Sequence, residues 1–289
     1  MNMATIRLLL KDKLPEKAVP MLRSITESIL ESYRHLISFC PYFDRQTAER
    51  LLQKLNTLSY ELIFPPLSYK DYAFDEYYSE LDVETNWLTT ANSLAQFLNK
   101  KLLKSILRPW TLDDDSGFGS GALNAFYVTM GNSFHLMSGM LLPPYFNADF
   151  PYFYNFMGVG EVIGHEIGHA LDFNHLTRDW TGKLSPLPLN VQKNIDDEKN
   201  CLNEFYDNIC FNYPKFDSKV CANGSQSSNE NFADQLGYRA IFRGYHQLAR
   251  QYNLDERVPG LEMFSIDQLM FIVYGRIGFG IIGSPVTNR

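Results

Sequence analysis

The sequence predicts a mainly helical α+β fold with a small β-sheet. Apolar residues recur at helical spacing over several long segments, whereas only two short segments show the pattern of strands. Of the 289 residues, 45% are hydrophobic and 20% are charged, which is typical of a globular chain that buries a substantial core. This length favours one or two domains.

Three helices are predicted in the N-terminal part of the chain, over residues 19–37, 47–62 and 85–107. Each carries an apolar stripe at helical spacing, and prolines follow the second and third helices. We expect the stripe of the third helix to face inward; it comprises Leu88, Ala91, Leu94, Ala95, Leu98, Leu102 and Ile106.

The acidic, glycine-rich stretch 113–121 is the best candidate for a domain boundary. We therefore expect a helical segment over residues 1–112 and a second domain over residues 113–289.

Beyond this stretch, strands are predicted over residues 122–130 and 133–142, and helices over residues 160–173 and 229–252. The two helices carry most of the candidate functional residues. Helices therefore outnumber strands along the whole sequence.

The net charge excludes some classes of partner. The chain has 26 Lys and Arg residues against 33 Asp and Glu residues, a net charge of −7. Since phosphate contacts need clustered cations, we expect no nucleic-acid binding.

No apolar run reaches the roughly 18–20 residues of a membrane span, and residues 1–10 lack the apolar core of a secretory signal. We expect either a cytosolic protein or a chain whose export signal lies elsewhere.

Four cysteines are present: Cys40, Cys201, Cys210 and Cys221. The last three lie close together in a polar stretch, and a glycosylation sequon at Asn223 follows them. This pattern favours an extracellular loop with one disulfide, for which Cys210–Cys221 is the candidate. Four free thiols and an unused sequon are the alternative.

The most informative motif is His165-Glu166-Ile167-Gly168-His169. Histidines four residues apart on a helix project from one face and can bind one Zn²⁺. Glu166 lies about 100° around the helix, where a carboxylate can reach a zinc-bound water as general base. The alternative is a buried helix with two histidines satisfied at its surface. Glycines in a helix interior cost about 1 kcal/mol each, so Gly164 and Gly168 indicate a packing constraint.

A catalytic zinc needs a third protein ligand, and Glu230 is the best candidate. Asp234 lies one turn later on the same helix face, where it could fix the tautomer of a ligand imidazole. Asp172, three residues after His169, is a second candidate for this role. An isolated Glu–Asp pair at this spacing more often forms a solvated face, but the upstream histidines favour the metal site.

These motifs together resemble the neprilysin and endothelin-converting-enzyme family of zinc metallopeptidases. Three blocks match in order, at residues 124–127, 165–172 and 230–234, and the segment 141–146 is also similar. The resemblance implies a catalytic domain similar to thermolysin over residues 113–289. It covers most of this chain, which is less than half as long as a usual family member.

The resemblance also implies roles for individual residues. One zinc ion per chain would be held by His165, His169 and Glu230, and Glu166 would activate the attacking water. Asp234 would orient His165 and assist proton transfer. Peptide substrates would contact Asn124, the backbone of Ala125, and an apolar pocket at Met140, Tyr145 and Val162. For these last three, packing in the core is an equal alternative.

Two departures from the family pattern concern the C-terminus. Gly278 and Phe279 occupy the places of a Trp-Cys pair, so Cys201, which resembles the usual partner of that cysteine, would be unpaired. If the last residues are a shortened version of the family's His-Ser-Pro segment, Gly283 replaces the histidine that stabilises the oxyanion. Arg289 then remains at the matching offset, where it would contact substrate.

We therefore expect a zinc metalloendopeptidase that acts on oligopeptides. A pseudo-peptidase that binds zinc and peptides without turnover is the main alternative, and a helical scaffold with an accidental motif is a third. The resemblance implies an extracellular or plasma-membrane-associated protein. The sequence predicts neither the oligomeric state nor the identity of the peptide.

Overall fold

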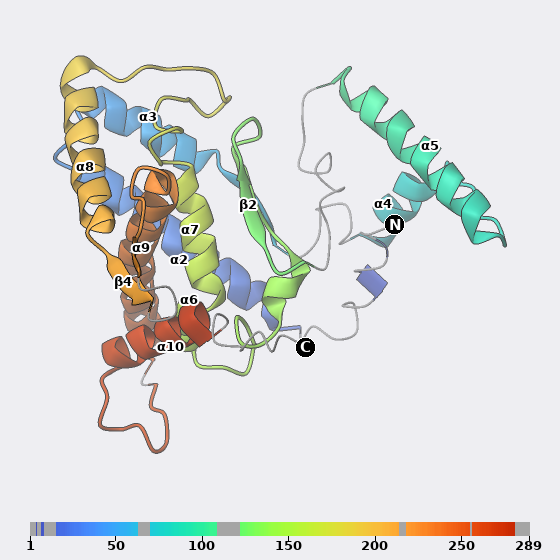
Figure 1. The fold of residues 1–289 in the computed structure, drawn as a ribbon. Helices are drawn as coiled ribbons and strands as arrows, with labels where there is room; N and C mark the ends of the chain where they lie inside the picture. Colours follow the sequence, from blue (N-terminus) through green and yellow to red (C-terminus); the bar gives the residue numbers. More distant parts are fainter. Residues whose placement is uncertain are drawn as a thin grey trace.

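The computed structural model describes residues 4, 7–8, 16–62, 70–108, 122–213, 218–254 and 256–280. In this part of the chain helices predominate, which confirms the predicted fold class (Figure 1). The helices are α2 (Ala18–Ser38), α3 (Arg45–Asn56), α4 (Asp71–Tyr78), α5 (Trp87–Ser105), α6 (Tyr152–Met157), α7 (Val159–His169), α8 (Leu189–Asp207), α9 (Ser228–Tyr252) and α10 (Ile266–Gly280). The strands are β1 (Ser59–Leu62), β2 (Ala125–Val128), β3 (Ser133–Leu136), β4 (Cys210–Tyr213) and β5 (Ser218–Cys221).

The core is built around α7, which lies among α2, α9 and the sheet (Figure 1). The predicted stripe of α2 is buried here, with Leu22, Ile25 and Ile29 fully covered. Because α2 precedes the candidate boundary and α7 and α9 follow it, one core draws on both sides of that stretch. Residues 113–121 lie outside the described residues, and the division into two domains stays a prediction.

Small residues let α7 and α9 approach closely. A Cβ atom added to Gly168 would lie 2.8 Å from the carbonyl oxygen of Ala233, and one added to Gly164 would lie 2.9 Å from Ile241 Cδ1. Helix α2 contacts the same part of α7: the buried Tyr33 hydroxyl donates a hydrogen bond of 2.7 Å to the carbonyl oxygen of Gly164. The packing constraint predicted for the two glycines is thus confirmed.

A three-stranded sheet in the order β1-β3-β2 flanks α7. Strand β1 pairs parallel with β3, and β2 pairs antiparallel with β3, so β2 is an edge strand. The predicted strand 133–142 is wrong at its end, because β3 stops at Leu136 and a 3₁₀ helix follows over Ser138–Leu141. The Pro143-Pro144 pair has no N–H groups with which to extend a ladder.

The predicted helix 47–62 is also wrong at its end. Helix α3 stops at Asn56, and the chain continues as β1. Leu58 and Leu62 fit the helical stripe and are buried, yet they reach the core from an extended segment. The ladder with β3 supplies the backbone partners for β1, and this long-range pairing is not visible in local periodicity.

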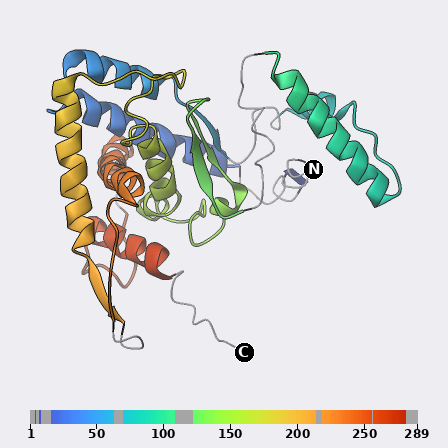
Figure 2. The ribbon, with the colours of Figure 1, turned by 45° about the horizontal axis from the view of Figure 1, so that its top comes forward.

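The third predicted helix is present as α5, but its leucine-rich stripe does not face inward. Leu88, Leu102 and Ile106 are 58%, 64% and 72% exposed, and the one buried residue of α5 is Phe97. Helices α4 and α5 lie apart from the core in both views (Figures 1 and 2). Phe97 packs on the rings of Tyr77 and Tyr78. In the described residues, no other helix or strand packs extensively against the leucine-rich stripe of α5.

Several elements were not predicted. Helix α4 forms in a tyrosine-rich segment without a clear stripe, and α6, α8 and α10 were not assigned from the sequence. Strands β4 and β5 form a hairpin whose Cys210–Cys221 disulfide confirms the candidate pair, while Cys40 and Cys201 are free. None of the helices in the described ranges combines the length and apolar character that a bilayer span requires.

We predict that Gly168→Ala destabilises the fold, because the new Cβ would clash with the backbone of α9. The free energy of unfolding should fall by about 1–3 kcal/mol in denaturant titrations. Gly275→Ala in α10 is the matched control, since a Cβ there meets nothing within 4 Å. It should leave stability unchanged or raise it by up to about 1 kcal/mol. Equal effects of the two substitutions would contradict the close-packing interpretation.

Candidate metal centre

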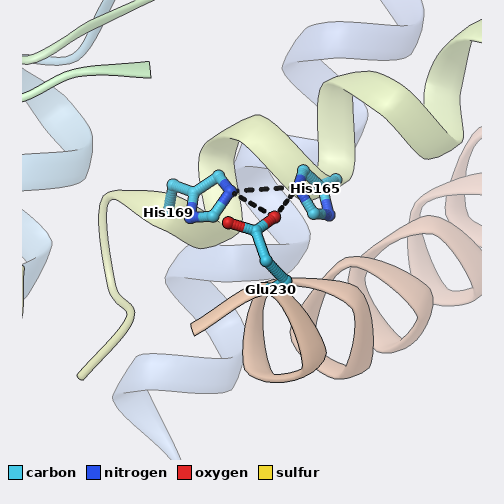
Figure 3. A group of neighbouring side chains, drawn as sticks. All are labelled: His165, His169 and Glu230. Carbon is cyan, nitrogen blue, oxygen red and sulfur yellow. Dashed lines mark hydrogen bonds and ion pairs between the residues drawn. The ribbon is translucent and has the colours of Figure 1, made fainter. Parts of the chain in front are cut away.

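The three candidate ligands converge at one point between two helices. His165 and His169 project from one face of α7, and Glu230 projects toward them from the first turn of α9 (Figure 3). The two Nε2 atoms are 2.9 Å apart, and Glu230 Oε2 lies 3.2 Å from His165 Nε2 and 3.3 Å from His169 Nε2. The ligand atoms of these three residues all lie within 4.8 Å of one another.

Each imidazole contacts a carboxylate through Nδ1, the ring nitrogen that does not face the other ligands. His165 Nδ1 lies 2.7 Å from Asp234 Oδ1, and His169 Nδ1 lies 2.9 Å from Asp172 Oδ2. An Nδ1–H group that donates to a carboxylate leaves the Nε2 lone pair for a metal. Both histidines are therefore oriented as metal ligands.

The donor set fits a zinc ion. Zinc–ligand distances of about 2.0–2.2 Å correspond to tetrahedral edges of roughly 3.3–3.6 Å, and the observed separations are near this range or slightly below it. Two imidazole nitrogens and a carboxylate oxygen this close together suit a shared cation between them. A tetrahedral ion with three protein ligands would also keep a fourth position for water.

The pKa of His165 reflects the same electrostatics. Burial opposes protonation of the ring, but the hydrogen bond and the charge of Asp234 outweigh it and raise the pKa to about 9. The Asp172 carboxyl is also buried, yet hydrogen bonds from His169 and His175 lower its pKa to about 2. The pKa shifts thus agree with favourable contacts between His165 and Asp234 and between His169 and Asp172.

Glu166 follows the first ligand and is 6% exposed. Burial raises the pKa of its carboxyl, and the nearby histidines only partly offset this effect. Glu161, one turn before His165, has its pKa raised to about 7 by burial and by the charge of Asp234. The side chain of Glu166 lines the cleft beside the three converging ligands.

The cleft has a volume of about 470 Å³ and runs between α7 and the edge strand β2. Its lining includes the predicted residues Asn124 and Ala125 together with Glu166 and all three candidate ligands. The sequence therefore predicted a set of residues that the fold brings to one cleft.

Other predicted substrate contacts lie elsewhere. Met140 is buried in the core, and Tyr145 and Val162 are partly buried and packed against it. These positions agree with the packing alternative, and the proposed pocket stays a prediction. Arg289 and Gly283 lie outside the described residues.

The sequence interpretation missed His175. This side chain lines the cleft, and its Nδ1 lies 2.9 Å from Asp172 Oδ1. A local signal was present, because His175 follows Asp172 by the same three positions that separate His169 from Asp172.

Comparison with known proteins assigns the chain to a family. The family model described as "Peptidase family M13" matches residues 124–279. The chain belongs to this family. Its metallopeptidases are zinc-dependent, and the resemblance to neprilysin and the endothelin-converting enzymes is confirmed.

Curated relatives extend this family assignment. Neprilysin-11 of Caenorhabditis elegans is 27% identical over 256 residues, which cover 86% of this chain and 29% of that protein. Human membrane metallo-endopeptidase-like 1 is 26% identical over 290 residues, 97% of this chain and 36% of that protein. The chain thus spans about a third of the length of these family members.

Solved structures show the same fold. The inhibitor complex of the Mycobacterium tuberculosis zinc metalloprotease ZMP1 has a TM-score of 0.74 at 22% identity and covers 96% of this chain and 40% of its own. The open state of that protein has a TM-score of 0.76 at 23% identity, with coverages of 96% and 42%.

We predict that Asp234→Asn weakens zinc binding, because the carboxylate that fixes the His165 ring is lost. Zinc affinity should fall about 10–100-fold in a chelator competition at constant pH. Asp196→Asn changes an exposed carboxylate of α8 and should leave the affinity unchanged. Wild-type affinity in the Asp234 variant would contradict the orienting role.

Proposed function

We propose that the chain is a zinc-dependent metalloendopeptidase that hydrolyses peptide bonds of oligopeptides. The convergence of His165 Nε2, His169 Nε2 and Glu230 Oε2 is the observation that carries the proposal. The first two ligands come from one helix turn, and the third comes from a helix more than 60 residues later. Family membership supports the assignment of one zinc ion per chain.

Zinc bound by these ligands would polarise the peptide carbonyl and make water more acidic. Glu166 is the proposed general base. Its burial and raised pKa suit a carboxylate that accepts a proton from the attacking water and then delivers it to the leaving amine. Asp234 would hold the His165 ring in place and assist proton transfer.

The edge strand β2 is the proposed binding surface for the peptide backbone. Its outer side faces the cleft, so an extended peptide could pair with it as an added strand. Asn124 and the backbone of Ala125 would anchor this peptide at the start of β2. Contacts with Met140, Tyr145, Val162 and Arg289 belong to the same proposal.

A catalytically impaired peptidase is the second candidate function, and the C-terminal sequence favours it. If the last residues are a shortened version of the family's His-Ser-Pro segment, Gly283 stands where the family pattern has a histidine that stabilises the oxyanion. The loss of one such donor typically lowers turnover by about 10²–10³-fold. Such a chain would bind zinc and peptides with little or no cleavage of the peptides.

We further propose an extracellular or plasma-membrane-associated location. The Cys210–Cys221 disulfide supports an oxidising compartment, and two mammalian relatives are named as membrane metallo-endopeptidases.

We predict that Glu166→Gln abolishes cleavage of an internally quenched fluorogenic peptide while zinc affinity remains. The amide cannot accept the proton of the attacking water, whereas the three ligands are unchanged. Glu204→Gln, at an exposed position of α8, is the control and should cleave like wild type.

The outcomes separate the two candidate functions. Equal cleavage by the Glu166 variant and wild type would overturn the proposed mechanism. Zinc and peptide binding by the wild-type chain without any cleavage would instead support the impaired peptidase.

A further inference from the structure

Three segments meet beside the zinc ligand His169. They are the turn that follows α7, the helix α3, and the connection between β2 and β3. His175, in the turn after α7, contacts both the carboxylate behind His169 and the end of the edge strand. Neither the metal centre nor the proposed hydrolysis accounts for this histidine.

On one side, His175 contacts Asp172, which is 1% exposed. Oxygen Oδ2 of Asp172 accepts the hydrogen bond of His169, and Oδ1 accepts backbone N–H groups from Asn174 and His175. The His175 ring adds an ion-pair contact of 2.9 Å from Nδ1 to Oδ1, which lacks the alignment of a hydrogen bond. The Asp172 carboxylate therefore contacts two imidazoles, those of His169, the proposed zinc ligand, and His175.

On the other side, His175 contacts the end of β2. Its Nε2 lies 2.8 Å from the hydroxyl of Thr129, the first residue after this strand. The ring also meets the ring of Tyr127 edge-on, with centroids 5.4 Å apart. The imidazole thus bridges the proposed peptide-binding strand and the carboxylate that orients His169.

Helix α3 fixes the turn that carries this bridge. The ammonium group of Lys54 is buried and donates to the carbonyl oxygens of His175 at 2.8 Å and Arg178 at 3.2 Å. Arg50 donates to the carbonyl oxygen of Leu176 at 2.9 Å. These bonds fix the backbone position from which the His175 ring enters the cleft.

We propose that His175 is a positioning residue that couples the edge strand β2 to the zinc ligand His169. It acts through Thr129 on the strand and through Asp172 on the ligand, and it keeps a bound peptide in register with the metal. This inference rests on the proposed function, because it assumes zinc at His169 and a peptide along β2. Groups that support ligands commonly affect both affinity and geometry.

The test compares His175→Ala with Thr129→Val, which removes only the link to the strand. Zinc affinity is measured by chelator competition, and the visible absorption of the Co²⁺-loaded chain reports ligand geometry. Affinity for the fluorogenic peptide is measured by anisotropy on zinc-loaded chains that also carry Glu166→Gln, so that no cleavage occurs.

His175→Ala should weaken zinc roughly 3–10-fold, less than the loss expected for a direct partner of a ligand, and should shift the Co²⁺ spectrum. It should also weaken peptide binding about 10-fold, whereas Thr129→Val should weaken peptide binding alone. The double variant His175→Ala/Thr129→Val should bind peptide no more weakly than His175→Ala, because both substitutions remove the same contact between His175 and Thr129. His246→Ala breaks a histidine–carboxylate pair with Asp267 and should change neither affinity.

Several outcomes would overturn the coupling. If His175→Ala lowers only the melting temperature and both affinities stay within twofold of wild type, the residue has a structural role alone. If that variant does not fold, His175→Leu, which fills similar space without polar atoms, replaces it, and wild-type values in both measurements would overturn the proposal equally. Zinc and peptide binding without cleavage by the wild-type chain would refute hydrolysis but leave the coupling measurable. A wild-type chain without zinc affinity would refute both.

Discussion

The close contact between α7 and α9 is the constraint on which the site depends. Two proposed ligands lie on one helix and the third lies on the other, so the spacing of the helix axes sets the separation of the donor atoms. Gly164 and Gly168 permit this spacing, because any larger side chain would meet Ala233 or Ile241. The hydrogen bond from Tyr33 of α2 to the backbone of α7 is a second restraint on the position of this helix.

Two carboxylates orient the histidine rings that this helix packing brings together. Asp234 on α9 and Asp172 after α7 each hold one imidazole by Nδ1, so both Nε2 lone pairs point to Glu230. The backbone turn after α7 is fastened in turn by Lys54 and Arg50 of α3. Residues on the N-terminal side of the candidate boundary thus contribute to the geometry of a site whose ligands all lie beyond it.

Local sequence patterns predicted which candidate side chains lie together more accurately than they predicted where individual helices and strands end. The spacing of His165 and His169 is a property of one helix turn, and the order of the matching blocks indicated Glu230. The end of α3 was missed because Leu58 fits a helix and a buried strand equally well, and only pairing with β3 decides between them. The leucines of α5 were predicted to be buried because periodicity shows that a helix has an apolar face but does not show what covers that face.

The unequal exposure of the three ligands has a consequence for metal loading. The side chain of Glu230 is 62% exposed, whereas those of His165 and His169 are 21% and 16% exposed. A metal ion bound here would be reached from solvent past the Glu230 carboxylate, because the two imidazoles lie on a helix packed into the core. We therefore expect zinc to bind after the chain has folded, unlike in a zinc finger, whose folding depends on the ion itself.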